Sequence, residues 1–278
     1  MDEMDRQPGA TFRSLLVHVD DADGAADRVR LAARLADAWG VHLTGAAAAE
    51  EFVPLYAEGG YIPADMMDME VRRVDLLVER AKALFEREAA NVRSRAWRSA
   101  HWPASLFVVE EARGADLVIV GHEAPGGARD PAFSAGDVIL AAGRPVLVVP
   151  ANVDRLEARR IVVAWKDTRE IRRALSDAMP LLRAAQEVVV VTISREVPEA
   201  PWDDLKAYLA RHGVTASFVH RAEAEGGAPE AVGKIAAAHG ADLIVAGAYG
   251  RWKWRERLFG GVTLDLLTTA PVCCLLSH

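Results

Sequence analysis

The chain contains the same pattern twice, and this internal repeat constrains its fold more than any other feature. The sequence GADLVIVG at Gly114–Gly121 returns as GADLIVAG at Gly240–Gly247, 126 positions later. The segment Arg144–Val149 matches Ala270–Leu275 at the same offset of 126. Two separate matches at one offset mean that the intervening segments have equal length, so we interpret the chain as a duplicated unit.

Each copy alternates strand-like and helix-like segments. Apolar runs such as Ser14–Val19, Arg160–Trp165 and Glu187–Ile193 are rich in β-branched residues and do not alternate with polar ones, which is typical of strands covered on both faces. Helical periodicity follows these runs in both halves. Its apolar positions are Val29, Ala32, Ala33 and Ala36 in the first half, and Ile171, Ala174, Leu175, Ala178, Leu181 and Leu182 in the second.

This alternation predicts the α/β fold class, with two tandem doubly wound domains, each built on a parallel sheet. The boundary is expected within Pro150–Ala158, which gives domains 1–150 and 151–278. Two connectors carry most of the asymmetry: Glu51–Asp68, which precedes a charged helix expected from about Met69 to Val92, and its shorter partner in the second half, near Arg195–Trp202. A length of 278 residues also favours two domains over one.

Composition excludes several classes of protein. The formal net charge of −7 argues against broad electrostatic binding of nucleic acid or of an anionic membrane, since that binding depends on Lys and Arg. No apolar run approaches the roughly 20 residues that span a bilayer, and the acidic start of the chain lacks the apolar core of a secretory signal. The two cysteines, Cys273 and Cys274, are adjacent and unsuited to a disulfide with each other. We therefore expect a cytoplasmic protein.

A glycine-rich stretch follows the second copy of the repeat. Gly247 ends an apolar run, Gly250 follows at the next turn, and Gly260–Thr263 then reads Gly-Gly-Val-Thr at an expected helix start. Glycines let backbone N–H groups approach an anion, and a helix start adds unpaired donors. The stretch predicts a phosphate site at the carboxyl ends of the strands, where open α/β sheets bind ligands. Thr263 is suited equally to contacting phosphate and to capping the helix.

This stretch closely resembles the ATP-binding signature of the universal stress protein family, G-x2-G-x9-G followed by Ser or Thr. The resemblance covers Ser14 to Leu276 in fold order and is specific in the second half. It implies two Rossmann-like domains of the adenine-nucleotide alpha-hydrolase-like kind, binding ATP with or without Mg2+. It also implies a sensor or regulator of the stress response and not an enzyme, so that any ATP hydrolysis is slow and incidental.

The resemblance assigns residues to the two ends of the nucleotide. The phosphate side is implied at Gly247, Gly250, Gly260, Gly261, Val262 and Thr263, and the adenine and ribose side at Trp165, Lys166, Asp167 and Thr168. Two positions depart from the family pattern. Gly261 stands where the family has a hydroxyl, which removes one phosphate contact, and Lys166 stands where the family commonly has an acidic residue.

The first copy of the site is degenerate. In its loop Ala124 replaces the second glycine, and Glu123, Asp130 and Asp137 place negative charge where phosphates would lie. Like charges at close range repel, so we expect no triphosphate there. Asp20 does keep an acidic residue after the first strand. At most one good nucleotide site per chain is the resulting prediction.

Alternatives remain open for two other segments. The basic segment Arg251–Arg257, with two tryptophans, reads either as a lid that neutralises phosphates or, preferably, as a solvated helix start. The apolar run Pro271–Leu276 is expected to pair with Pro145–Val149 inside the chain, forming a pseudo-dimer of the two domains, or else to join two chains as a homodimer.

Other chemistries find little support in the sequence. The eight histidines show no zinc-like spacing with cysteines or carboxylates, and neither a GxxxxGK[ST] loop nor a GxSxG elbow is present. The alternative to nucleotide binding is therefore an interaction or scaffold protein that keeps the fold without a nucleotide. Gly261 and the degenerate first site favour that alternative.

Overall fold

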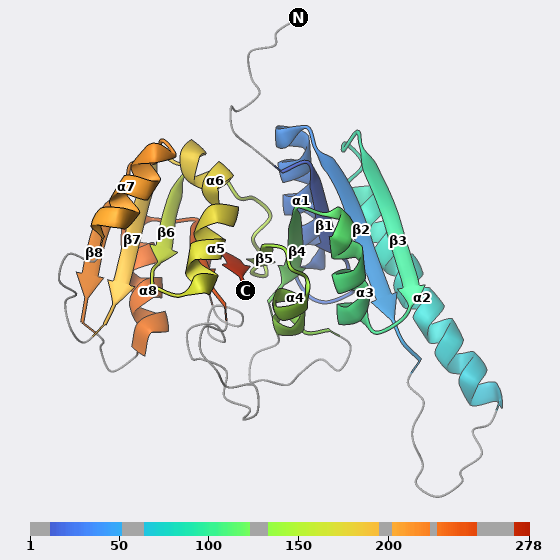
Figure 1. Ribbon diagram of the computed structural model, residues 1–278. Coiled ribbons are helices and arrows are strands. Elements are labelled where there is room, and N and C mark those ends of the chain that lie inside the picture. The colour runs from blue at the N-terminus through green and yellow to red at the C-terminus, as the bar shows by residue number, and fades with distance from the viewer. Residues whose placement is uncertain (1–11, 52–63, 123–132, 195–201, 223–226, 249–269) are drawn as a thin grey trace, which may run out of the picture.

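The computed structural model describes residues 12–51, 64–122, 133–194, 202–222, 227–248 and 270–278, which form one ten-stranded sheet with helices on both faces (Figure 1). The strands are β1 (Ser14–His18), β2 (His42–Ala49), β3 (Arg95–His101), β4 (Leu117–Gly121), β5 (Val146–Val149), β6 (Arg160–Ala164), β7 (Glu187–Ile193), β8 (Ser217–Arg221), β9 (Leu243–Gly247) and β10 (Cys273–Ser277). The helices are α1 (Ala25–Trp39), α2 (Ala64–Glu88), α3 (Ala104–Glu111), the 3-10 helix η1 (Ala112–Gly114), α4 (Ala135–Ala141), α5 (Arg169–Asp177), α6 (Met179–Ala184), α7 (Asp203–Arg211) and α8 (Gly227–His239).

Strand order shows that the two halves repeat one topology. The sheet runs β3-β2-β1-β4-β5 and then β10-β9-β6-β7-β8, so each half has the same order read outward from the centre. Pairing is parallel within each half, for example Leu15 opposite Leu117 and Ile161 opposite Leu243. The fold class predicted from the repeat is confirmed, and the doubly wound order reverses between β1 and β4 and between β6 and β9.

The two halves join through an antiparallel pair at the centre of the sheet. β10 pairs with β5, with Cys274 opposite Val148 and Leu276 opposite Val146. Of the two arrangements left open by the sequence, the structure has the one inside the chain. Both apolar strands are therefore covered by a partner strand, which removes a pair of edges that would otherwise invite association.

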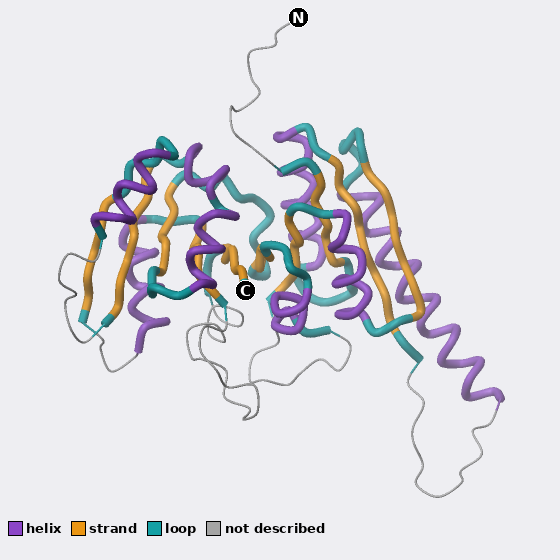
Figure 2. Tube along the Cα trace, viewed as in Figure 1, coloured by secondary structure: helices purple, strands orange, loops and turns teal. Residues whose placement is uncertain are grey.

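Helices lie on both faces of the sheet (Figure 2), and alternating side chains of the strands build an apolar layer on each face. On one face the strands pack against α1, α2, α5, α6 and α7, and on the other against α3, α4 and α8. Cys273 belongs to the first layer and Cys274 to the second, so the adjacent thiols point to opposite faces. Both are free and buried, as their lack of disulfide geometry predicts.

Two helix boundaries differ from the sequence-based expectation. α2 begins at Ala64, whereas the connector was expected to extend to Asp68. The periodic stretch from Ile171 to Leu182 is not one helix, because α5 ends at Asp177 and α6 begins at Met179 with Pro180 in its first turn. A proline tolerated at a helix start lacks the N–H that a continuous helix needs.

In the part of the chain that the structure describes, no helix combines the length and the apolar character needed to cross a membrane.

Candidate functional site

The candidate sites lie at the two points where strand order reverses. We call the carboxyl ends of β1 and β4 the first switch point, and those of β6 and β9 the second switch point. In each half a helix starts just after the first of these strands, α1 after β1 and α5 after β6. Ligands of doubly wound proteins bind at such positions, so these two places can be compared residue by residue.

At the first switch point the buried side chain of Arg28 lies over the end of β4. Its Nε donates to the main-chain oxygen of His18 (2.9 Å), and its Nη2 donates to Oδ1 of Asp20 (2.7 Å). The remaining nitrogen, Nη1, lies 2.2 Å from the point that a Cβ on Gly121 would occupy. Only 3% of Arg28 is exposed, so the guanidinium fills the space above Gly121.

Two rings and a carboxylate complete the surroundings of Arg28. The His18 ring stacks on Phe133 with 3.8 Å between ring centroids, and its Nδ1 lies 3.4 Å from Oδ2 of Asp20. Burial raises the pKa of Asp20, but the nearby charges of Arg28 and His18 and the hydrogen bonds from Arg28 and Ala22 outweigh it and lower that pKa below its usual value. Asp20 therefore stays ionised, as the partner of a buried cation must.

His122 follows Gly121 at the same strand end. Burial lowers its pKa to about 4, so the ring is neutral at pH 7. Its Nε2 is buried and, among the described residues, has no hydrogen-bond partner. The sequence did not single out this polar group for any role.

At the second switch point the start of α5 takes the place that a guanidinium takes in the first half. A Cβ on Gly247 would lie 2.5 Å from the backbone nitrogen of Ile171 and 2.9 Å from Cβ of Glu170. The absence of a side chain at Gly247 is thus required by the close packing of α5 on β9. This packing accounts for the glycine even if no ligand binds there. Gly247 is therefore not, by itself, evidence for the phosphate contact that the sequence analysis assigned to it.

Glu170 is the buried charge of this second switch point, with 5% exposed. Burial raises its pKa, while hydrogen bonds from Arg169, from its own backbone N–H and from Thr168 lower it to a value below the usual one. The Arg169 Nε lies 2.5 Å from Oε1 of Glu170. A carboxylate in the first turn of a helix is also favoured by the helix dipole.

The structure gives roles to the residues assigned to the adenine and ribose side. Trp165 is half-buried and packs against the apolar layer, and Asp167 accepts two hydrogen bonds from Arg172 at 2.9 and 2.7 Å. Thr168 caps α5, with its Oγ1 3.5 Å from the N–H nitrogen of Ile171. Lys166 is exposed, and no carboxylate among the described residues pairs with it. Gly250, Gly260, Gly261, Val262 and Thr263 lie outside the described residues, as do Ala124 and the basic segment.

Arg28 and Glu170 hold corresponding positions, a relation that the sequence analysis missed. Each comes directly before the residue at which the periodic apolar stripe of its helix was identified, Val29 in α1 and Ile171 in α5, although Arg28 is the fourth residue of α1 and Glu170 the second of α5. Each is buried and lies against the glycine that ends the fourth strand of its half. The sequence signal that could have revealed this relation is a charged residue directly beside the apolar stripe of a helix in both halves.

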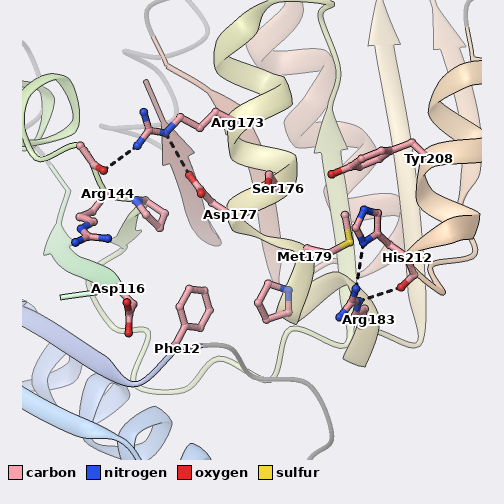
Figure 3. A pocket seen from close by; sticks show the side chains of 13 residues that line it. Phe12, Asp116, Arg144, Arg173, Ser176, Asp177, Met179, Arg183, Tyr208 and His212 are labelled. Atoms are coloured by element: carbon pink, nitrogen blue, oxygen red, sulfur yellow. Dashed lines mark hydrogen bonds and ion pairs between the residues drawn. The ribbon is translucent and has the colours of Figure 1, made fainter.

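A separate cavity of about 390 Å3 lies between the halves (Figure 3). Phe12, Asp116 and Arg144 line it from the first half, and α5, α6 and α7 line it from the second. Its carboxylates are engaged: Asp116 accepts from two backbone N–H groups, and Asp177 accepts from Ser277. The cavity lies at the opposite ends of β1 and β4 from the first switch point.

The described ranges contain neither a cluster of metal ligands nor a reactive thiol. No group of three or more His, Cys, Asp or Glu side chains there could hold a metal ion. Burial raises the pKa of Cys273 to about 12 and raises that of Cys274 further, so both thiols stay protonated and unreactive at neutral pH.

Comparison with solved structures identifies the architecture. A universal stress protein from Archaeoglobus fulgidus DSM 4304 superimposes with a TM-score of 0.71 at 12% identity, over 95% of this chain and 96% of that one. The chain has the universal stress protein fold. A protein of unknown function from Pseudomonas aeruginosa PAO1 gives a TM-score of 0.57 at 15% identity, over 96% of this chain and 92% of that one. No protein-family model and no curated protein match the sequence.

The matches to this fold extend over both halves, which supports the tandem arrangement expected from the repeat. The universal stress protein fold thus agrees with the resemblance seen in the glycine motif.

Proposed function

We propose that the protein is a cytoplasmic regulator or sensor that binds ATP, or a related adenine nucleotide, in the half formed by residues 151–278. The half formed by residues 1–150 serves as a domain of the same fold without a nucleotide site. We do not propose an enzymatic activity for either half.

The observation that carries this proposal is the difference between the two switch points. In the first, the guanidinium of Arg28 fills the space above Gly121 and is bound to Asp20. In the second, no described cation fills the corresponding place, Lys166 has no carboxylate partner among the described residues, and the glycine motif continues beyond Gly247. Because the start of α5 already fills the space above Gly247, we propose that a nucleotide on the second side lies beyond the start of α5, where Lys166 has no carboxylate partner among the described residues.

The described residues fit the nucleoside end of ATP better than its phosphates. Trp165 offers an aromatic surface, and Asp167 and Thr168 offer polar atoms beside it. The buried carboxylate of Glu170 repels phosphate from the end of β9. We therefore propose that the phosphates bind further along, at Gly250 and Gly260–Thr263, with Lys166 as a mobile positive charge near the base or ribose.

Calorimetric and thermal-shift titration with MgATP tests the proposal. The intact protein is expected to bind saturably, and Gly250→Val is expected to lose that binding, because a branched side chain keeps backbone N–H groups away from phosphate. Gly233→Ala is the matched control, since a Cβ at this helical glycine meets no atom within 4 Å. Absence of saturable binding, or unchanged binding by Gly250→Val, would refute the assignment.

A second candidate function is an interaction protein that keeps the fold and needs no nucleotide. Two observations favour it: Gly247 is explained by packing against α5, and Gly261 lacks the hydroxyl of the family signature. Native mass spectrometry of freshly purified protein separates the candidates. A co-purified nucleotide supports the first, whereas a nucleotide-free chain that also fails to bind added MgATP supports the second.

A further inference from the structure

The contacts of Arg28 are those of a bound ligand and not those of a surface arginine. Two nitrogens of its guanidinium donate hydrogen bonds, Nε to the His18 carbonyl and Nη2 to the Asp20 carboxylate, and Nη1 occupies the space that a side chain on Gly121 would need. The group is buried at the place where doubly wound folds bind ligands. The other arginines with ion pairs on α1, Arg30 and Arg34, are far more exposed, at 35% and 50% of their side chains.

The surroundings select a planar cation. A carbonyl oxygen and a carboxylate oxygen accept from two different nitrogens of one group, which suits the fixed fork of a guanidinium better than the point charge of an ammonium. Gly121 lacks the side chain that would occupy the third edge of that plane. His18 holds its ring against Phe133, with 9° between the two planes, and completes the wall beside Asp20.

We propose that the first switch point is a receptor for a guanidinium group and that Arg28 is its permanent internal ligand. The first half thus fills its own ligand position, which makes its folding independent of any nucleotide and closes it to anions that would compete for the same space. This proposal does not depend on whether the second half binds a nucleotide.

Chemical rescue of Arg28→Ala provides the test. Removing the side chain leaves the half-buried Asp20 carboxylate without its cation and empties the buried space that the guanidinium fills, and we expect the melting temperature to fall by about 10 °C. Guanidinium or methylguanidinium chloride at millimolar concentration, far below the molar range that denatures proteins, is expected to raise that temperature in a saturable manner. Urea, a neutral molecule of similar shape, is expected to give no rise.

Matched variants keep the test decisive. Arg34→Ala, on an exposed face of the same helix, is expected to melt near the wild-type temperature and to show no rescue. Arg28→Lys keeps the charge without the fork, so it is expected to remain folded but to melt several degrees below the wild type. The double variant Asp20→Asn/Arg28→Ala is expected to lose the rescue.

Three results would overturn the proposal. They are rescue by urea equal to that by guanidinium, absence of rescue in a folded Arg28→Ala protein, and wild-type stability of Arg28→Lys. If Arg28→Ala does not fold, the melting temperatures of Arg28→Lys and the wild type decide whether the site requires a guanidinium. Equal melting temperatures would mean that any cation suffices.

Discussion

The first and second switch points are equivalent in topology but opposite in buried charge. The first holds the cation Arg28, bound to Asp20, and the second holds the anion Glu170 in the first turn of α5. Both charges lie against the glycine that ends the neighbouring strand. Duplication therefore preserved the backbone of the site while each copy acquired its own electrostatics, and the two copies are expected to respond differently to the same ligand.

Loss of the Asp20 charge is the largest expected effect. Asp20→Asn leaves the buried guanidinium of Arg28 without its carboxylate, and we expect the free energy of unfolding to fall by about 3 kcal/mol. Urea denaturation measures this, and Asp21→Asn is the control, because Asp21 is exposed and belongs to no ion pair in the described residues. Equal stability of the two variants would mean that the pair contributes nothing to the first half.

The pH dependence of the same variant follows from the lowered pKa of Asp20. A carboxylate whose pKa is lower in the folded state stabilises the protein above its unfolded pKa of about 3.9, and this contribution is lost as the pH falls through the folded value. The stability difference between wild type and Asp20→Asn is therefore expected to be constant from neutral pH to about pH 5 and to shrink below about pH 4. A difference that shrinks instead toward alkaline pH would contradict this assignment.

Gly247→Ala tests whether the second switch point is held by packing. The added Cβ would lie 2.5 Å from the backbone nitrogen of Ile171, so α5 must move, at a cost of about 2 kcal/mol. Gly233→Ala is expected to be neutral or to stabilise α8 by up to about 1 kcal/mol. A harmless Gly247→Ala would show that α5 does not pack closely on β9.

Removal of the Glu170 charge tests the electrostatic difference directly. Glu170→Gln keeps the shape and is expected to strengthen MgATP binding about tenfold, corresponding to roughly 1.4 kcal/mol, by removing a charge that repels phosphate. Calorimetry measures it, with Glu157→Gln, exposed and away from the helix start, as the control. Weaker binding by Glu170→Gln would instead mean that the carboxylate contacts the ligand.

The smallest expected effect concerns the start of α5. Thr168→Ala removes a side-chain cap and is expected to lower the free energy of unfolding by about 1 kcal/mol. Thr168→Ser retains the hydroxyl and is expected to recover most of this loss, as measured by thermal unfolding. A larger loss of MgATP affinity than of stability would assign Thr168 to the ligand as well as to the helix.

The doubly wound fold, its repetition in the two halves and the ends of β4 and β9 as places for a ligand could be predicted from the sequence, whereas the pairing of β10 with β5 was one of two arrangements that the sequence left open. Equal offsets between the two copies fix equal topology, and apolar β-branched runs such as β7 fix the strands. The break between α5 and α6 was not predicted, because the apolar periodicity continues through it while Pro180 ends the hydrogen bonding.

The electrostatics of the site could not be predicted in the same way. Gly247 was interpreted as a phosphate contact because glycine after a strand has that use, yet close packing of α5 requires the same residue. Asp20 was recognised as acidic, but its partner Arg28 lies a full helical turn into α1, where periodicity alone does not distinguish a buried arginine from a surface one.

Photoaffinity labelling with an azido-adenosine triphosphate, followed by peptide mapping, tests the central claim of asymmetry most directly. The account predicts ATP-protected label only in peptides from residues 151–278, including those near Trp165–Thr168, and none in peptides from residues 12–150. Protected label around Asp20 or Gly121, or no protected label at all, would contradict it.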